Sequence, residues 1–268
     1  MIRILSFFAV IISLAFVFDG ITLADEPVWR DEFDGTKLDY SKWECEVNAF
    51  GGGNQELQMF TDRKENVRVE NGVLIIEARQ DSPNIAGTVR EYSSGRVRTK
   101  HRGDWLYGRI DVRAKLPKGQ GIWPAIWMLS TEEKYGGWAS SGEIDIMEFK
   151  GHQTTKIYGS LHYGASWPKN RFTTGTYELT QGDFSTDFHV FSVDWQREKI
   201  TWLVDGTAYQ TLDQWSTDAA AFPAPFDQPF HLLLNLSVGG GFVGTPDATT
   251  AYPQRFEVDY VRVFPPRP

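Results

Sequence analysis

Short runs in which polar and apolar residues alternate are the dominant pattern of this 268-residue chain. Residues 109–116 are the clearest example, because charged side chains alternate there with Ile110, Val112, Ala114 and Leu116. Successive side chains of a β-strand point to opposite faces, so this run predicts a strand with one buried side and one solvent-facing side. Further β-rich runs lie at 74–78, 95–99, 157–161, 190–194, 230–236 and 256–263.

Turn residues between these runs indicate how the strands are connected. Asp205-Gly206 separates residues 200–204 from 207–210. Because Asp-Gly accommodates the positive φ values of a type I′ turn, these two runs are predicted to form an antiparallel hairpin. Many short strands joined by turns favour an all-β fold, an antiparallel sandwich of two sheets. One short helix is predicted at residues 216–222, in a loop that ends at Pro223.

Three acids stand in the middle of an apolar run that otherwise predicts a buried strand: Glu143, Asp145 and Glu148. An ionised carboxylate in a sheet core costs roughly several kcal/mol unless it is paired or used in catalysis. A regular pleat would place Glu143 and Asp145 on one face and Glu148 on the other. A β-bulge at Ile146 or Met147 would restore the phase and bring all three acids onto one surface.

Two carboxylates on one surface are what a glycosidase uses for catalysis. With the bulge, the Cα atoms of Glu143 and Glu148 would lie roughly 13 Å apart. Inward-leaning side chains would permit the carboxyl separation of about 5–5.5 Å that a retaining glycosidase needs. Asp145 between them would raise the pKa of its neighbours and share a proton with the nucleophile. The hexapeptide alone is also compatible with a solvated edge strand or a cation site.

The run Glu143-Ile-Asp-Ile-Met-Glu148 resembles the bulged motif of the family 16 glycoside hydrolases, in its laminarinase-type form. The resemblance implies that Glu143 is the nucleophile, Asp145 an assisting acid and Glu148 the general acid/base. It also implies a curved jelly roll with a substrate cleft across its concave face. Five other segments resemble blocks of the same family in the same order: 31–35, 53–58, 121–129, 235–240 and 258–263.

Tryptophans are the first candidates for binding sugar, because pyranose faces stack on aromatic rings. Trp123 and Trp127 are four residues apart, so they share one face of a predicted strand. Core packing is the alternative for both. The resemblance supports them as glycan platforms, together with Trp138 in the loop before the acidic run. Three other tryptophans are assigned to the core: Trp43, Trp195 and Trp202.

Three polar residues complete the candidate substrate-binding set. His162 follows a strand expected beside the acidic one, and an imidazole near a carboxylic acid tunes its proton transfer. A buried core histidine is the alternative, and the resemblance to a family histidine favours the site. Arg96 and Asn48 resemble sugar-binding positions, with exposed solubilising roles as their alternatives.

The amino terminus predicts export. Residues 1–24 contain Arg3, an apolar run at 4–18 and small residues near the end of the segment, which is the pattern of a secretory signal peptide. Residues 25–268 are then expected to form one catalytic domain, secreted or periplasmic and with no membrane attachment. Cys45 is the only cysteine, so no internal disulfide is expected.

The formal net charge of -8 disfavours nucleic acid and other polyanions as partners and favours a neutral polysaccharide. The protein is expected to be a monomer. No cofactor or metal is expected for catalysis. The resemblance allows a structural calcium ion at positions similar to Glu32, Gly72 and Asp259.

Taken together, these features predict a secreted, retaining endo-β-glucanase that hydrolyses β-1,3 or mixed β-1,3/1,4 glucans such as laminarin. A galactanase of the same family, of the agarase, porphyranase or carrageenase type, and a transglycosylase are the enzymatic alternatives. A non-catalytic, lectin-like glucan-binding protein is the alternative outside enzymes, because the same sandwich fold also occurs in proteins without catalytic activity.

Overall fold

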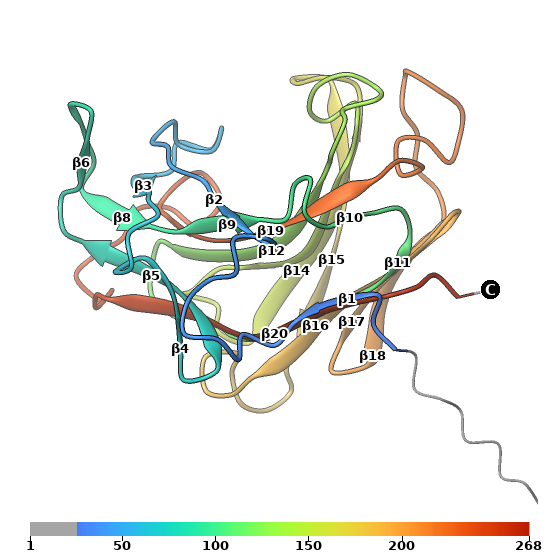
Figure 1. The fold of residues 1–268 in the computed structure, drawn as a ribbon. Helices are drawn as coiled ribbons and strands as arrows, with labels where there is room; N and C mark the ends of the chain where they lie inside the picture. Colours follow the sequence, from blue (N-terminus) through green and yellow to red (C-terminus); the bar gives the residue numbers. More distant parts are fainter. Residues whose placement is uncertain (1–25, 268) are drawn as a thin grey trace, which may run out of the picture.

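The computed structural model describes residues 26–267, which form a sandwich of two large sheets (Figure 1). Between these residues the structure contains no helix, and therefore no helix that is long and apolar enough to cross a membrane. The predicted signal peptide lies outside the described residues.

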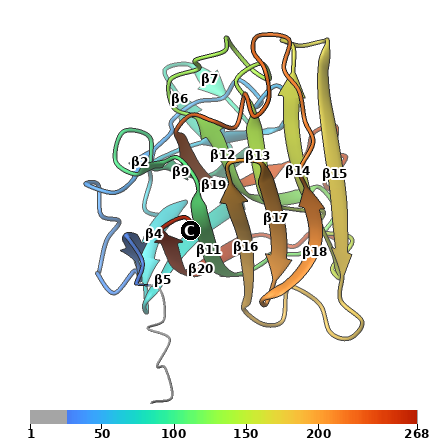
Figure 2. The ribbon, with the colours of Figure 1, turned by 90° about the vertical axis from the view of Figure 1, so that its right-hand side faces the viewer.

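The eight-stranded sheet carries the acidic run. Its order is β15 (Asn170–Glu178), β14 (Lys156–Gly164), β13 (Glu143–Phe149), β12 (Ile122–Ser130), β19 (Phe230–Val238), β9 (Arg96–Arg98) and β2 (Glu44–Cys45), with β10 (Asp104–Trp105) paired to β19. Figure 1 shows this sheet curving upward at β14 and β15, which makes its free face concave. We call this free face the cleft face. Figure 2 shows β15 at the open edge of the sheet.

The ten-stranded sheet covers the opposite face. Its order is β18 (Thr207–Leu212), β17 (Lys199–Val204), β16 (His189–Gln196), β11 (Gly108–Lys115), β20 (Gln254–Phe264), β5 (Val73–Gln80), β8 (Tyr92–Ser94) and β3 (Gln58–Phe60), with β1 (Trp29–Asp31) paired to β20 and β4 (Val67–Glu70) to β5. A separate hairpin consists of β6 (Asn84–Ile85) and β7 (Thr88–Val89). The pairs are antiparallel except for β3 with β8.

The hydrophobic core lies between the two sheets and follows the alternation in the sequence. Ile110, Val112 and Ala114 of β11 are fully buried, while the charged residues between them are partly exposed. The three tryptophans assigned to the core, Trp43, Trp195 and Trp202, have no exposed surface, which confirms that assignment. The all-β sandwich prediction is therefore confirmed.

The predicted hairpin is also present. Val204 pairs with Thr207, and Asp205 and Gly206 between them have φ values of 48° and 78°. The positive values at both positions are those that a type I′ turn requires.

The predicted helix at residues 216–222 is wrong. The segment is a loop, in which Thr217 Oγ1 accepts a hydrogen bond from the Ala219 amide and donates one to the Gly164 carbonyl. Such local side-chain bonds compete with helical hydrogen bonds. The three consecutive alanines are exposed, so no apolar face is buried that would stabilise so short a helix.

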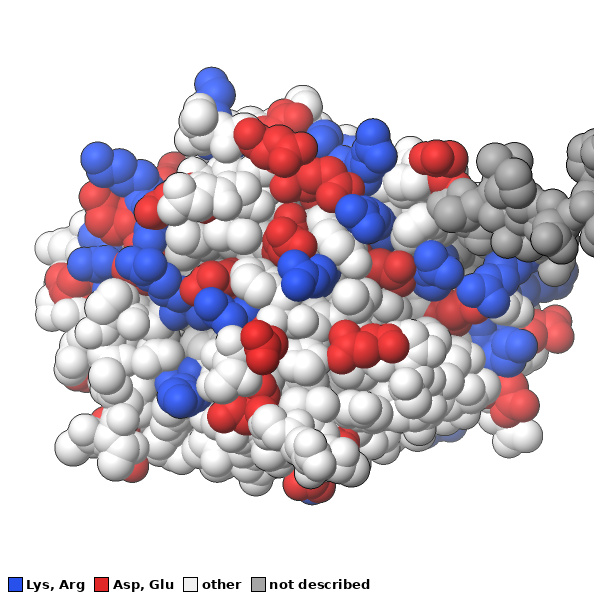
Figure 3. Space-filling model, turned by 90° about the horizontal axis from the view of Figure 1, so that it is seen from below, with Lys and Arg blue, Asp and Glu red and all other residues white. Residues whose placement is uncertain are grey.

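The outer face of the ten-stranded sheet has charges of both signs. Figure 3 shows lysine and arginine side chains interspersed with aspartate and glutamate on this face. Arg113 of β11 pairs with Asp259 of β20 at 2.6 Å, and Lys115 pairs with Glu257 at 3.0 Å. Such exposed pairs contribute little stability, about 0–1 kcal/mol each.

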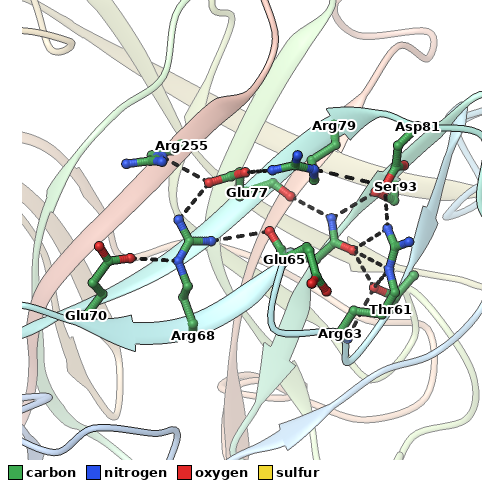
Figure 4. Close-up of polar contacts among 11 residues, drawn as sticks. Thr61, Arg63, Glu65, Arg68, Glu70, Glu77, Arg79, Asp81, Ser93 and Arg255 are labelled. Carbon is green, nitrogen blue, oxygen red and sulfur yellow. Dashed lines mark hydrogen bonds and ion pairs between the residues drawn. The ribbon is translucent and has the colours of Figure 1, made fainter.

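A buried carboxylate at one end of this sheet is held by three arginines (Figure 4). Glu77 accepts from Arg68 at 2.7 Å and from Arg255 at 2.9 Å, and it also contacts Arg79. Burial alone would raise the pKa of Glu77, but the hydrogen bonds and charges of the arginines outweigh it and lower the pKa. The cluster joins β4, β5 and β20 and leaves the cleft face free for function.

Candidate active site

The bulge predicted at Ile146 or Met147 is present in β13. On the β12 side, Trp127 pairs with Asp145 and Ile126 with Met147, so Ile146 is the extra residue. On the β14 side, the register shifts between Asp145 and Glu148. Two residues therefore oppose one, and the acids return to the cleft face after the bulge. The apolar residues of the same strand face the core with at most 1% exposure: Ile144, Ile146, Met147 and Phe149.

Glu143 stands at the start of β13 between a tryptophan and a histidine. Trp138 Nε1 donates a hydrogen bond to Glu143 Oε2 at 2.8 Å. His162 Nε2 lies 3.8 Å from Glu143 Oε1 and 3.2 Å from Asp145 Oδ2. Potential ligand atoms of Glu143, Asp145 and His162 lie within 4.8 Å of one another, a spacing that also satisfies a metal site.

Glu148 is held from the other side of the bulge. Trp123 Nε1 donates to Glu148 Oε1 at 3.2 Å. The Trp123 side chain is only 8% exposed and packs against Phe242, with ring centroids 5.0 Å apart. The structure thus places Trp123 as a support for Glu148 rather than as an open stacking surface. Each of the two glutamates receives one indole N–H.

The three acids do not ionise independently. Burial raises the pKa of Glu143 to about 8, with the charge of Asp145 as the second cause, while His162 and the Trp138 hydrogen bond oppose the shift. Burial also raises the pKa of Asp145, partly offset by its hydrogen bond with Glu143. The pKa of Glu148 is raised well above its usual range by burial and then by the charges of Asp145 and Glu143. Glu148 feels the charges of both other acids, so of the two glutamates it is the one suited to keep its proton while Glu143 ionises, as acid/base catalysis requires.

A family model described as "Glycosyl hydrolases family 16" matches residues 54–262. This chain belongs to glycoside hydrolase family 16. Glucan endo-1,3-beta-glucosidase A1 of Niallia circulans is 46% identical over 255 residues, which are 88% of this chain and 37% of that protein. A beta-glucanase of Rhodothermus marinus is 44% identical over 89% of this chain and 85% of its own length.

Solved structures agree with this membership. The laminarinase catalytic domain of Thermotoga maritima MSB8 has a TM-score of 0.80 and 40% sequence identity, covering 91% of this chain and 99% of that one. The resemblance read from the hexapeptide and the jelly-roll prediction are both confirmed. This family 16 chain spans 37% of the first relative and most of the second.

Two of the predicted sugar-binding residues meet in this hydrolase through an acid that the sequence did not single out. Glu46 Oε2 accepts from Asn48 Nδ2 at 3.3 Å and lies 3.4 Å from Arg96 Nη1. Arg96 is 6% exposed, and its guanidinium lies 4.4 Å from the Phe60 ring centroid and 5.3 Å from that of Trp127. The Nε atom of Arg96 is buried and has no partner among the described residues. Arg96 is therefore a buried cleft residue and not an exposed solubilising one.

Trp127 is oriented by a buried chain of hydrogen bonds. Its Nε1 donates to Asn235 Oδ1 at 2.7 Å, and Asn235 Nδ2 donates to Ser237 Oγ at 3.1 Å. Ser237 Oγ in turn donates to Glu56 Oε2 at 2.8 Å, and Gln58 Nε2 donates to the same oxygen at 2.7 Å. The sequence pointed to segments 53–58 and 235–240 as family blocks but gave these side chains no role. These side chains contact one another, and so orient Trp127, only because β12 pairs with β19.

The cleft face continues past Trp138 as a cavity of about 190 Å³. Glu46, Arg98 and His231 line it together with Trp138, whose side chain is 40% exposed. All six predicted binding residues thus lie on or beside the face that carries the acids. Trp138 and His162 contact the acids near the start of β13, Trp123 contacts Glu148, and Asn48, Arg96 and Trp127 lie toward β9.

Removal of His162 should change the pH dependence of hydrolysis. The positive charge of His162 lowers the pKa of Glu143, so His162→Gln should raise that pKa and move the acidic limb of kcat/KM to higher pH. We expect kcat to fall about tenfold. The measurement is a pH–rate profile of both proteins. His101→Gln, which alters an exposed histidine near Asp104, should leave the profile unchanged. Superimposable profiles for His162→Gln and wild type would show that His162 does not act on the acids.

Proposed function

We propose that this hydrolase is an endo-acting β-glucanase that cleaves β-1,3 bonds, or β-1,4 bonds in mixed β-1,3/1,4 glucans, with retention of anomeric configuration. The observation that supports it most is the pair of glutamates on one face of β13, on either side of the bulge and each bonded to an indole N–H. The two relatives and the solved structure described above are named as β-glucanases or laminarinases.

The arrangement supplies both steps of a double displacement. Ionised Glu143 attacks the anomeric carbon, while protonated Glu148 donates its proton to the departing glycosidic oxygen. In the second step, Glu148 removes a proton from water, which attacks the same carbon and releases Glu143. Trp138 donates to Glu143 Oε2, and His162 Nε2 lies 3.8 Å from Glu143 Oε1 and 3.2 Å from Asp145 Oδ2, so the nucleophile is held in place.

The test of this function is the release of reducing ends from four polysaccharides: laminarin, mixed-linkage glucan, agarose and carrageenan. We expect activity on laminarin, weaker or equal activity on mixed-linkage glucan, and none on the galactans. Glu148→Gln serves as the inactive control. Cleavage of a galactan alone would overturn the substrate, and transfer to added oligosaccharide in place of hydrolysis would indicate a transglycosylase. Glucan binding without release of ends would indicate a lectin-like protein.

The location and oligomeric state of the enzyme are part of the same proposal. Export through a signal peptide at residues 1–24, to the periplasm or the medium, suits an enzyme whose polysaccharide substrate does not enter cells. We also propose that the enzyme acts as a monomer on neutral glucan.

A structural calcium ion belongs to the proposal as well. Glu32 follows β1 and Asp259 lies on β20, and these two strands pair in the ten-stranded sheet. Gly72 lies in the turn between β4 and β5. Two carboxylates and a carbonyl are oxygen donors that fit calcium. Both Glu32 oxygens accept from Arg262, at 2.9 and 2.8 Å, and Asp259 pairs with Arg113 at 2.6 Å, so a bound ion would replace an arginine at each carboxylate.

Calcium removal should therefore lower stability and leave the chemistry intact. An ion at 100 times its Kd stabilises the folded state by about 2.7 kcal/mol, so we expect chelation to lower Tm by several degrees. Initial rates at low temperature should not change, because the acids on β13 need no metal. Differential scanning calorimetry and laminarin hydrolysis, each with and without EDTA, measure both effects. Unchanged Tm would exclude a stabilising ion, and lost activity would place a metal among Glu143, Asp145 and His162.

A further inference from the structure

An exposed phenylalanine lies on the cleft face two strands away from the nucleophile. Phe172 belongs to the edge strand β15, and 65% of its surface is exposed. Glu143 pairs with His162, and His162 pairs with Phe172, so the three residues form one row across β13, β14 and β15. Neighbouring strands are about 4.8 Å apart, which puts Phe172 about 10 Å from β13.

Phe172 is the outer member of a row of aromatic rings. Its ring stacks on the imidazole of His162, with centroids 5.6 Å apart and an interplanar angle of 28°. Trp138 contacts the same imidazole at 5.7 Å. The row therefore extends from the tryptophan that hydrogen-bonds the nucleophile to the edge of the sheet.

Apart from the contact with His162, the neighbours of Phe172 on β15 give no structural reason for an aromatic ring. Thr174 and Thr176, which follow it on the same face of β15, are exposed and polar. An exposed apolar residue on an edge strand favours unwanted association between chains. A ligand that covers the ring during function would explain why this position is aromatic.

The two sides of the cleft differ in a way that indicates which part of the substrate Phe172 contacts. Toward β9, Arg96 and Asn235 are 6% and 3% exposed and are fixed by hydrogen bonds or ring contacts. On β15, Phe172, Thr174 and Thr176 are exposed to solvent. In a double displacement, one fragment stays bound to the nucleophile while the other departs. Buried, prearranged polar groups suit the fragment that stays, and an open aromatic face suits the fragment that leaves.

We propose that Phe172 is a stacking platform for a glucosyl residue of the leaving fragment, an inference that rests on the proposed glucanase function. The C–H face of the sugar packs on the phenyl ring, and its hydroxyls remain in water or reach the neighbouring threonines. Phe172 thereby helps to determine how many sugars the enzyme holds on the β15 side of the scissile bond.

The test compares the hydrolysis of laminari-oligosaccharides of increasing length by wild type, Phe172→Ala, Phe172→Leu and Phe172→Tyr. The substrates are labelled with 18O at the reducing end, so that mass spectrometry identifies the leaving fragment. We expect the alanine and leucine variants to lose about tenfold in kcat/KM on the longest substrates, the effect of roughly 1.4 kcal/mol of lost stacking. Their cleavage sites should shift toward the reducing end, giving shorter leaving fragments, and tyrosine should retain the wild-type pattern.

The matched control is Tyr40→Ala, which removes another exposed aromatic ring (59% exposed) outside the Trp138–His162–Phe172 row. It should leave both rate and pattern unchanged. An equal loss of rate at every substrate length would show a structural role for Phe172 and overturn the proposal, as would unchanged rates and cleavage sites. Wild-type protein that fails to cleave any laminari-oligosaccharide would instead overturn the proposed function. The leucine variant keeps an apolar side chain, so the comparison survives if the alanine variant does not fold.

Discussion

Glu143→Gln is expected to lower kcat on laminarin by about 10⁴-fold or more, because a neutral amide cannot form the glycosyl-enzyme intermediate. Glutamine keeps the size of the side chain and can still accept the hydrogen bond from Trp138. Binding of laminari-oligosaccharides should therefore persist. Initial rates of reducing-end release measure the first effect, and isothermal titration calorimetry measures the second.

The control for this variant is Glu178→Gln, which neutralises an exposed acid on β15 that pairs with Lys156. Its kcat should equal that of wild type. If Glu143→Gln retained more than about a hundredth of wild-type activity, Glu143 would not be the nucleophile.

Glu148→Gln is expected to stabilise the protein at alkaline pH. The pKa of Glu148 is raised in the folded protein, so the folded state binds its proton more tightly than the unfolded state does. Below the usual glutamate pKa of 4.5, Glu148 is protonated in both states and the substitution should matter little. As pH rises above that value, the wild type must either keep the proton or bury a charge, and its stability falls.

The free energy of unfolding of Glu148→Gln should therefore exceed that of wild type by a margin that widens as pH rises toward 8. The Tm of the variant should be higher than that of wild type at pH 8 and similar to it near pH 4. Calorimetry of wild type and variant from pH 4 to pH 8.5 gives the difference directly, and titrating groups remote from the three acids cancel in it. If the difference did not grow with pH, or if the variant were less stable than wild type at pH 8, the pKa of Glu148 would not be raised in the folded protein.

Both predictions follow from residues that the sequence made visible. The acids of residues 143–148 could be assigned to one surface because the mismatch between their spacing and the strand period required a bulge, and the bulge occurs at Ile146. The strands and the Asp205-Gly206 hairpin were predictable for the same reason, since period-two alternation and turn chemistry are local properties.

The rest of the site depends on contacts between segments distant in the chain. Trp127 reaches Asn235, and Ser237 reaches Glu56, only because β12 pairs with β19 and residues 56–58 pack beside it. The sequence expected Trp123 to line a sugar site, whereas the structure shows its indole supporting Glu148. The helix predicted at residues 216–222 is absent because the local hydrogen bonds of Thr217 outweigh the helix propensity of the three alanines.

The most direct test of the mechanism is to trap the covalent intermediate. A fluorinated laminaribioside with a good leaving group slows the second displacement, so the sugar remains on the nucleophile long enough for peptide mass spectrometry. We predict one added sugar unit on the peptide that contains Glu143, and none in Glu143→Gln. Labelling of a different residue, or hydrolysis of the same reagent with inversion and no adduct, would contradict the assignment of Glu143 as the nucleophile of a retaining glucanase.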